Sequence, residues 1–333
     1  MREFFQRLAH ELEGGRAAVL VSILCSGGST PRGAGSMMAV LSDGTSFGTV
    51  GGGAAEWEAQ LEAARLLRAG ENAVRDFRFV PGDASGAGMV CGGSVTLHFH
   101  CLDPADPASA AVFRELTLAD GRGADAWFVR RLDGAAVKDM GVADRNGTRL
   151  CAAQAPSSVL GDRAVLSEDG WFAIPAARAG RVWVFGGGHV ARALVPVIAR
   201  VGFRPAVFDD RPEFADAALF PDAAEVLCGS FGAVSEKVHV TQDDYVVIMT
   251  RGHQADYETL TQTLRSGARY LGCIGSATKL ALCRKRLLDA GFTAEEYAAL
   301  HAPIGLAIGA QTPEEIAVSV AAELIAVRSG VIK

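Results

Sequence analysis

A glycine-rich turn at residues 186–191, GGGHVA, is the first segment that points to ligand chemistry. Gly186, Gly188 and Ala191 fit the G-x-G-x-x-G/A pattern, which combines a tight turn, close approach of a pyrophosphate and close packing of a helix on its strand. Asp209 follows 23 positions after Gly186, where a carboxylate binds a ribose 2′-hydroxyl and disfavours a 2′-phosphate. The pattern indicates a nucleotide site or a bare Rossmann scaffold, and its setting between strand and helix favours the site.

Polar residues follow a second buried strand at 245–250. In open α/β sheets ligands bind at the carboxyl ends of the strands, so Thr250, Arg251 and His253 are expected to line the same crevice as the glycine turn. Arg251 suits an anionic group, and His253 suits proton transfer or ligation unless it is an ordinary loop residue. Ser276, in the next glycine-bearing turn, is a further candidate for a phosphate.

Two glycine-rich segments in the first half of the chain could bind an anion. The loop 26–35 carries Arg32, and backbone amides in such a loop can form an anion nest. Gly51, Gly52 and Gly53 open a helix whose amino end favours anions, with Glu56 in its first turn. No GxxxxGK[ST] motif is present, which excludes a Walker-type ATPase, and simple hairpin turns are the alternative interpretation.

A cysteine and two histidines complete the candidates. Cys91 lies in the glycine-rich segment 86–93, where a thiol would be approachable. Such a thiol could contact a soft metal or take part in sulfur transfer. The alternative is that Cys91 is a small buried hydrophobe, as most unpaired cysteines are. His98 and His100 alternate on one face of the next strand. Since no third ligand stands at a telling spacing, we interpret them as structural.

From residue 181 onward, strand and helix patterns alternate, as in a parallel sheet with helices on both faces. We expect a Rossmann-like domain over 179–333. Thr312, Pro313 and Glu315 predict the capped start of a last helix that ends near 328. The expected strands are 181–185, 204–209, 224–228, 245–250 and 270–273, with helices at 189–201, 256–265 and 279–290.

The first half predicts an α+β domain over 1–178. A helix near 2–13 precedes a strand at 17–24 and a hairpin that turns at Asp43-Gly44. Weaker signals after residue 105 repeat this order, so we expect two related halves, about 1–104 and 105–178. Further expected elements are helices at 54–69 and 107–119 and strands at 94–101, 124–132 and 137–143, whereas 162–181, with Pro175 and Gly180, is interpreted as exit and linker.

Composition narrows the function classes. The 333 residues predict two or three domains, and a net charge of −6 gives no basic face for nucleic acid. No apolar run approaches about 18 residues and the amino end is charged, so we expect neither a membrane span nor a signal peptide. Seven irregularly spaced cysteines argue against a disulfide framework and for a reducing cytoplasm.

Taken together and in order, the motifs resemble the xanthine dehydrogenase accessory (XdhC/CoxI) family. The resemblance covers both halves and leaves out mainly 103–180. One departure is Gly187, where members of the family often carry alanine. The motifs are GSTPR (28–32), GTVGGG (48–53) with Glu56, MVCGG (89–93), GGGHVA (186–191), DDRP (209–212), TRGH (250–253), IGS (274–276), HAPIG (301–305) and TPEEIA (312–317).

The resemblance implies a maturation factor without turnover of its own, which binds molybdenum cofactor, supports its sulfuration and inserts it into a hydroxylase such as xanthine dehydrogenase or aldehyde oxidoreductase. The cofactor would be molybdopterin or its cytosine dinucleotide. Partners would be the apo hydroxylase, a cysteine desulfurase and cofactor-biosynthesis proteins, and we expect a homodimer because soluble oligomers are most often twofold. The binding residues would be Arg32, Gly51, Gly52, Gly53, Glu56, Cys91 (also the molybdenum or sulfur contact), Gly186, Gly188, His189, Asp209, Arg251, His253 and Ser276.

Two other classes use the same Rossmann residues. An NAD-dependent oxidoreductase would employ Gly186, Gly188 and Asp209 for the cofactor, with His253 or His301 as acid/base. An NAD-binding sensor would bind the nucleotide without turnover. Against both, the first half carries as much glycine and thiol patterning as the second.

Overall fold

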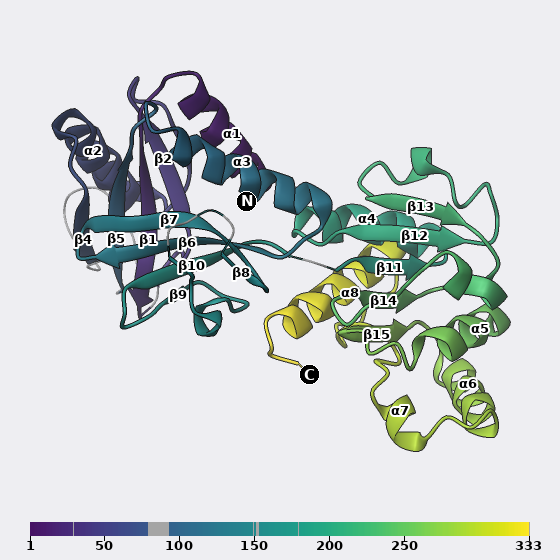
Figure 1. The fold of residues 1–333 in the computed structure, drawn as a ribbon. Helices are drawn as coiled ribbons and strands as arrows, with labels where there is room; N and C mark the ends of the chain where they lie inside the picture. Colours follow the sequence, from purple (N-terminus) through teal and green to yellow (C-terminus); the bar gives the residue numbers. More distant parts are fainter. Residues whose placement is uncertain (29, 79–92, 149, 151–152, 179, 333) are drawn as a thin grey trace. The chain divides into compact units, whose positions relative to one another are not determined.

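The computed structural model describes the chain except residues 29, 79–92, 149, 151–152, 179 and 333. Its contacts divide it into an N-terminal unit, Met1–Arg178, and a C-terminal unit, Ala179–Lys333 (Figure 1). No helix in the described ranges is both long and apolar enough to cross a membrane.

The N-terminal unit contains two five-stranded antiparallel sheets with the same strand order. The first runs β3-β2-β1-β5-β4 and the second β8-β7-β6-β10-β9, so each places its own strands in the order third, second, first, fifth, fourth. The strands of the first are β1 (Ala18–Gly27), β2 (Met37–Leu41), β3 (Ser46–Gly48), β4 (Ala73–Arg78) and β5 (Ser94–Leu102). Those of the second are β6 (Ala126–Asp133), β7 (Ala136–Asp144), β8 (Gly147–Thr148), β9 (Val165–Leu166) and β10 (Trp171–Ala177).

Helices precede and connect these strands. The helices α1 (Arg2–Glu13) and α3 (Pro107–Arg122) each lead into one sheet and pack against each other (Figure 1). In the first half α2 (Gly53–Ala69) links β3 to β4, whereas in the second a 3₁₀ turn, η1 (Ser157–Val159), occupies the corresponding place.

The expectation of a linker over 162–181 is wrong. This segment contains β9 and β10, and β10 pairs with β6 in the interior of the second sheet. Pro175 is tolerated because the register between β10 and β6 shifts between Pro175 and Ala177, and an irregularity of this kind is where a strand accepts a residue without an N–H. The strand β4 was also not predicted.

One apolar core joins the two sheets. It contains buried side chains from both halves, among them Leu20 of the first sheet and Phe172 of the second. Phe113 of α3 stacks on Phe5 of α1 with ring centroids 6.0 Å apart and lies 5.5 Å from Phe128 of β6. Each sheet therefore buries one of its two apolar faces against the other half, while the opposite face of the first sheet packs on α2.

The C-terminal unit is an α/β domain, which confirms the predicted fold class. Its five parallel strands have the order β13-β12-β11-β14-β15, and the chain reverses its direction of progress across the sheet between β11 and β14. That reversal is the switch point where such sheets form a ligand crevice. The strands are β11 (Val182–Phe185), β12 (Pro205–Asp209), β13 (Glu225–Cys228), β14 (Tyr245–Ile248) and β15 (Tyr270–Cys273).

Helices cover both faces of this sheet. One apolar cluster joins it to α4 (His189–Arg200) and α8 (Pro313–Arg328), and another joins it to α5 (His253–Thr263) and α6 (Ala277–Asp289). The predicted cap of α8 is confirmed, since the Thr312 hydroxyl accepts from the Glu315 amide at 3.2 Å and Glu315 accepts from the Thr312 amide at 3.0 Å. Short turns complete the unit: η2 (Ala217–Leu219), η3 (Phe231–Glu236) and α7 (Ala294–Ala298).

The shared core predicts that the two halves of the N-terminal unit unfold together. Phe113→Ala should lower the free energy of unfolding of this unit by about 3–5 kcal/mol, because it leaves a cavity between the sheets. Leu118→Ala, on the same helix but 44% exposed, is the control and should change it by less than about 0.5 kcal/mol. Hydrogen exchange of wild type and both variants measures the free energy of unfolding of each sheet. Undiminished protection of β1 in Phe113→Ala would contradict the joint unfolding of the two halves.

Candidate functional site

The N-terminal unit contains a cavity of about 620 Å³ beside the GSTPR loop. Its wall combines the start of α1, the loop into β2, the end of β3 and the segment that leads into β9 and β10. It is lined by Met1, Phe4, Arg32, Gly33, Ala34, Gly35, Ser36, Met37, Gly48, Thr49, Arg163, Ala164, Ile174 and Pro175. Residues from both halves therefore build it, and its volume is in the range of small-molecule sites.

Two arginines give the cavity a positive wall. Arg32 comes from the first half and Arg163 from the second, and both are exposed. No carboxylate is among the described residues that line the cavity. The sequence analysis predicted Arg32 but missed Arg163, because the segment 162–181 was interpreted as a linker. The apolar residues at 165–166 and 171–177, which form β9 and β10, were the signal that this segment belongs to the sheet.

Gly48 shapes the wall beside Thr49. Its φ is +79°, and a Cβ there would lie 2.4 Å from the Met37 carbonyl oxygen and 2.7 Å from the Phe4 ring. Only glycine permits this approach of α1 to the hairpin. The turn thus brings Phe4 to the cavity.

The glycines at 51–53 are organised around Glu56. One carboxylate oxygen of Glu56 accepts from the Thr49 hydroxyl at 2.5 Å and from the amides of Val50 and Gly52 at 3.1 and 3.0 Å. The Gly51 amide donates to the Thr49 hydroxyl oxygen at 3.2 Å. The amides of Gly51 and Gly52, predicted for a phosphate, thus donate within the loop, and Glu56 occupies the anion position at the amino end of α2.

Burial by itself would raise the pKa of Glu56. The hydrogen bonds from Thr49 and from the amides of the loop outweigh burial and hold that pKa below its ordinary value. Glu56 is thus a carboxylate at neutral pH that fixes Thr49 on the cavity wall.

The candidate soft ligand, Cys91, lies outside the described residues. Across the described ranges, no three His, Cys, Asp or Glu side chains gather where they could hold a metal ion. His98 and His100 are buried inside the N-terminal unit, in line with a structural interpretation.

In the C-terminal unit the glycine turn joins β11 to α4. Gly188 is the N-cap of α4, and a Cβ on it would meet nothing within 4 Å, so this side of the turn is open. Gly187 is closed in, because a Cβ there would lie 2.2 Å from the carbonyl oxygen of Phe214. The segment after β12 thus leaves room only for glycine at position 187.

Asp209 lies at the end of β12, 1% exposed, with both carboxylate oxygens occupied. It accepts from the Gly187 amide at 2.8 Å, from the Arg211 amide at 3.0 Å and from the Arg211 guanidinium at 2.9 and 3.1 Å. Four hydrogen bonds fill the capacity of a carboxylate. Burial would raise the pKa of Asp209, but the bonds from Arg211 and Gly187 together lower it.

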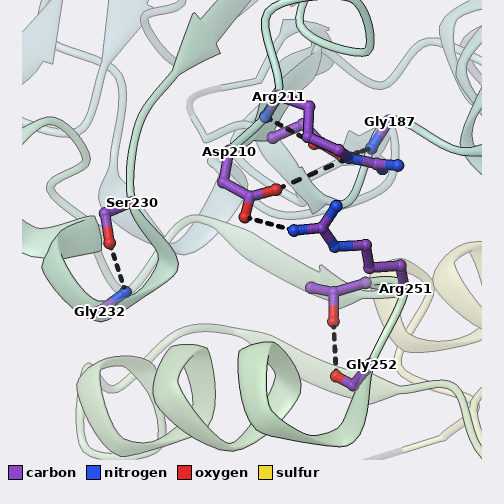
Figure 2. A network of polar contacts seen from close by, with 9 residues as sticks. Gly187, Asp210, Arg211, Ser230, Gly232, Arg251 and Gly252 are labelled. Atoms are coloured by element: carbon purple, nitrogen blue, oxygen red, sulfur yellow. Dashed lines mark hydrogen bonds and ion pairs between the residues drawn. The ribbon is translucent and has the colours of Figure 1, made fainter.

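Figure 2 shows that the network continues to the segment after β14, a strand that β11 separates from β12. Arg251, after β14, donates to Asp210 at 3.1 Å, and Asp210 also lies 3.7 Å from Arg211. The guanidinium of Arg211 stacks on Phe214, 3.5 Å from the ring centroid. The structure therefore links the predicted Asp209 and Arg251 through Arg211 and Asp210, neither of which was among the predicted site residues.

The other predicted residues lie at helix starts along the same sheet edge. His189 and His253 are the exposed first residues of α4 and α5. The Ser276 hydroxyl caps α6 by accepting from the Lys279 amide at 3.4 Å. Thr250 donates to the buried Asp256 at 2.5 Å, and that carboxylate forms an ion pair with Lys279.

The contacts of Glu56 predict a pH-dependent contribution to stability. Glu56→Gln should lower the free energy of unfolding at pH 7 by about 1–2 kcal/mol, because it weakens hydrogen bonds to a charged acceptor. Since the folded-state pKa is lowered, the difference from wild type is complete above about pH 4.5 and shrinks as the pH falls through that pKa. Urea unfolding of both proteins at several pH values measures this difference in free energy. A difference that does not change with pH would contradict the lowered pKa of Glu56.

Comparison with known proteins adds two family matches and several relatives. Residues 11–78 match the XdhC and CoxI family, and residues 182–324 match the XdhC Rossmann domain. The uncharacterized protein YqeB of Escherichia coli is 38% identical over 150 residues, 45% of this chain and 27% of its own length. A probable xanthine dehydrogenase subunit of Bacillus subtilis is 32% identical over 151 residues, 45% of this chain and 44% of its own length.

This chain thus spans less than half the length of those two relatives. The molybdenum cofactor insertion chaperone PaoD of Escherichia coli is 24% identical over 322 residues, 95% of this chain and 85% of its own. A crystal structure of a xanthine dehydrogenase from Bacillus halodurans superposes with a TM-score of 0.79 at 26% identity, over 99% of this chain and 97% of that one. The matches fall on both units and confirm the resemblance of the motifs: the chain belongs to the XdhC and CoxI family.

Proposed function

We propose that this protein binds molybdenum cofactor and inserts it into an apo molybdenum hydroxylase, acting as a maturation factor without turnover of its own. The observation that carries the proposal is the cavity of about 620 Å³ whose wall combines Arg32 and Arg163. Similarity to an insertion chaperone over 95% of the chain gives independent support.

The residues of the cavity fit a pterin that carries a phosphate. Phe4, Ile174 and Pro175 offer apolar surface to a flat ring. Arg32 and Arg163 offer guanidinium groups, which suit phosphate through paired N–H donors. In this proposal Glu56 acts through Thr49 as a positioning residue, and the cofactor is cargo that must be released again to the client.

Some features of the proposal rest on the family alone. Cys91 would be the molybdenum or sulfur contact, and a cysteine desulfurase would supply the sulfur. Gly186, Gly188 and the residues around Asp209 would hold a nucleotide moiety, either of a dinucleotide form of the cofactor or of NAD.

The cavity predicts that Arg32 and Arg163 both contribute to binding of the phosphate. Arg32→Ala should weaken binding of cofactor released from a purified xanthine dehydrogenase about tenfold or more, as expected for the loss of a charge-assisted hydrogen bond. Arg163→Ala should do the same. Arg65→Ala, an exposed α2 arginine paired with Glu62 outside the cavity, should bind as wild type does.

Anaerobic equilibrium binding, followed by cofactor absorbance and by molybdenum that co-elutes, measures these affinities. Reconstitution of an apo hydroxylase then tests insertion, with Cys91→Ala as a further variant. Equal binding by Arg32→Ala and wild type would remove the cavity from the proposal. An absence of cofactor binding by wild type would overturn the function itself.

The Asp209 network bears on the NAD alternatives. Because Arg211 and the glycine turn already use both oxygens of Asp209, a ribose hydroxyl would have to displace the guanidinium. We therefore expect wild type to bind NAD weakly and Arg211→Ala to bind it at least tenfold more tightly. Isothermal titration calorimetry measures both affinities, with Arg265→Ala, an exposed arginine paired with Glu296, as the control. Tight binding by wild type that Asp209→Asn abolishes would restore the NAD alternatives.

A further inference from the structure

A fully buried arginine lies between the two sheets of the N-terminal unit. Arg130 of β6 is 0% exposed, and its guanidinium carbon lies 5.2 and 5.3 Å from the ring centroids of Phe128 and Phe172. Its Nη1 donates to Nδ1 of His98 at 3.3 Å. Neither the sequence motifs nor the proposed function use this side chain.

No counter-ion for Arg130 is found within the part of the chain that the structure describes. Burial lowers its pKa to about 9, so the guanidinium is still charged at neutral pH. Its Nε and Nη2 atoms are buried without a hydrogen-bond partner. An unpaired buried charge destabilises a fold by several kcal/mol, which makes this arrangement incomplete as it stands.

The neighbouring His98 cannot neutralise it. Nε2 of His98 lies 3.1 Å from the carbonyl oxygen of Ala135, which assigns the ring proton to Nε2 and leaves Nδ1 as the acceptor for Arg130. Burial and then the charge of Arg130 lower the pKa of His98 to about 3. The imidazole is thus a neutral ligand of the guanidinium.

Two further buried polar atoms belong to the same region. The Oγ of Ser22 and the Nδ1 of His100 are buried without a partner. In the pairing of β1 with β5, Ser22 stands opposite His98, and His100 lies two residues further along the same face. The His100 ring lies 6.2 Å, centroid to centroid, from the His98 ring that accepts from Arg130. Burial and then the charge of Arg130 also hold the pKa of His100 well below its ordinary value.

We propose that this cluster, defined as Ser22, His98, His100 and Arg130, is a buried site for a small oxyanion of carboxylate or nitrate size. The Nε and Nη2 atoms lie on one edge of the guanidinium and present two parallel N–H donors, which matches two oxygens of one anion. Ser22 and His100 can each donate a further hydrogen bond.

The site takes side chains from both halves of the unit, Ser22, His98 and His100 from the first sheet and Arg130 from the second. An anion held there neutralises the buried charge and links the two sheets. Ordered water could occupy the same donors but would leave the charge in place. The proposal does not depend on the cofactor cavity or on its cargo.

The first test measures the thermal unfolding of the full chain in sodium formate. Sodium gluconate, whose anion is too large for a closed site, keeps the ionic strength constant. Wild type should gain about 3 °C or more for each tenfold rise in formate above its Kd. Arg130→Met should not respond, whereas Arg131→Met, which removes the exposed neighbour, should respond as wild type does.

A second test needs no variant and holds even if Arg130→Met does not fold. Crystals of wild type soaked in sodium bromide should show an anomalous bromide peak beside Nε and Nη2 of Arg130. Density that fits only water there, together with unfolding that does not depend on formate, would overturn the proposal. Formate stabilisation of equal size in folded Arg130→Met would also overturn it, since the anion would then bind elsewhere.

Discussion

Each antiparallel sheet of the N-terminal unit has one apolar face that its own half does not cover. The packing of these two faces in one core is the constraint on which the rest of this unit depends. Phe5, Phe113 and Phe128 fill the space between helices and sheets, and each comes from an element that precedes or begins one of the two halves. Because the halves face each other, loops distant in sequence meet at one rim. The cavity that we propose for the cofactor lies where this happens, between the loop that contains Arg32 and the segment that contains Arg163.

Buried carboxylates have protein partners in both units. In the N-terminal unit Glu11 pairs with Arg16 and Asp125 with Arg145. In the C-terminal unit the partners are Arg211 for Asp209, Lys279 for Asp256, Thr241 and the Arg181 amide for Asp244, and Tyr270, His301 and the Gly305 amide for Glu323. These contacts bind loops to the sheet and to α8 without an added ligand. Arg130 in the N-terminal unit has no such carboxylate among the described residues, and this difference is the reason to look for an exogenous anion there.

The two units therefore offer different prospects for ligand binding. At the C-terminal sheet edge the side chains that a Rossmann motif predicts are engaged with one another, so a ligand there must compete with Arg211. At the N-terminal cavity two guanidinium groups line a space of about 620 Å³ that no described carboxylate lines. The saturation of Asp209 by Arg211 and the two arginines of the cavity are the reasons why we propose the N-terminal unit as the site of the cargo.

Helices and strands with strong local patterns could be predicted from the amino-acid sequence. Hydrophobic periodicity placed all five parallel strands and the helices α4, α5, α6 and α8, and the residue types at 312–315 identified the cap of α8, since a cap depends on neighbours only. The ordered motifs likewise identified the family.

Contacts between residues that are distant in the sequence could not be predicted and became visible only in the tertiary structure. The strands β9 and β10 were missed because Pro175 breaks a local strand pattern, although the partner strand β6 and a register shift accommodate it. Because that segment was interpreted as a linker, Arg163 was not among the candidate residues. The sequence also gave no sign that Arg211 would use up the hydrogen-bonding capacity of Asp209. Which polar groups are satisfied depends on what packs opposite them, and a linear pattern does not contain that information.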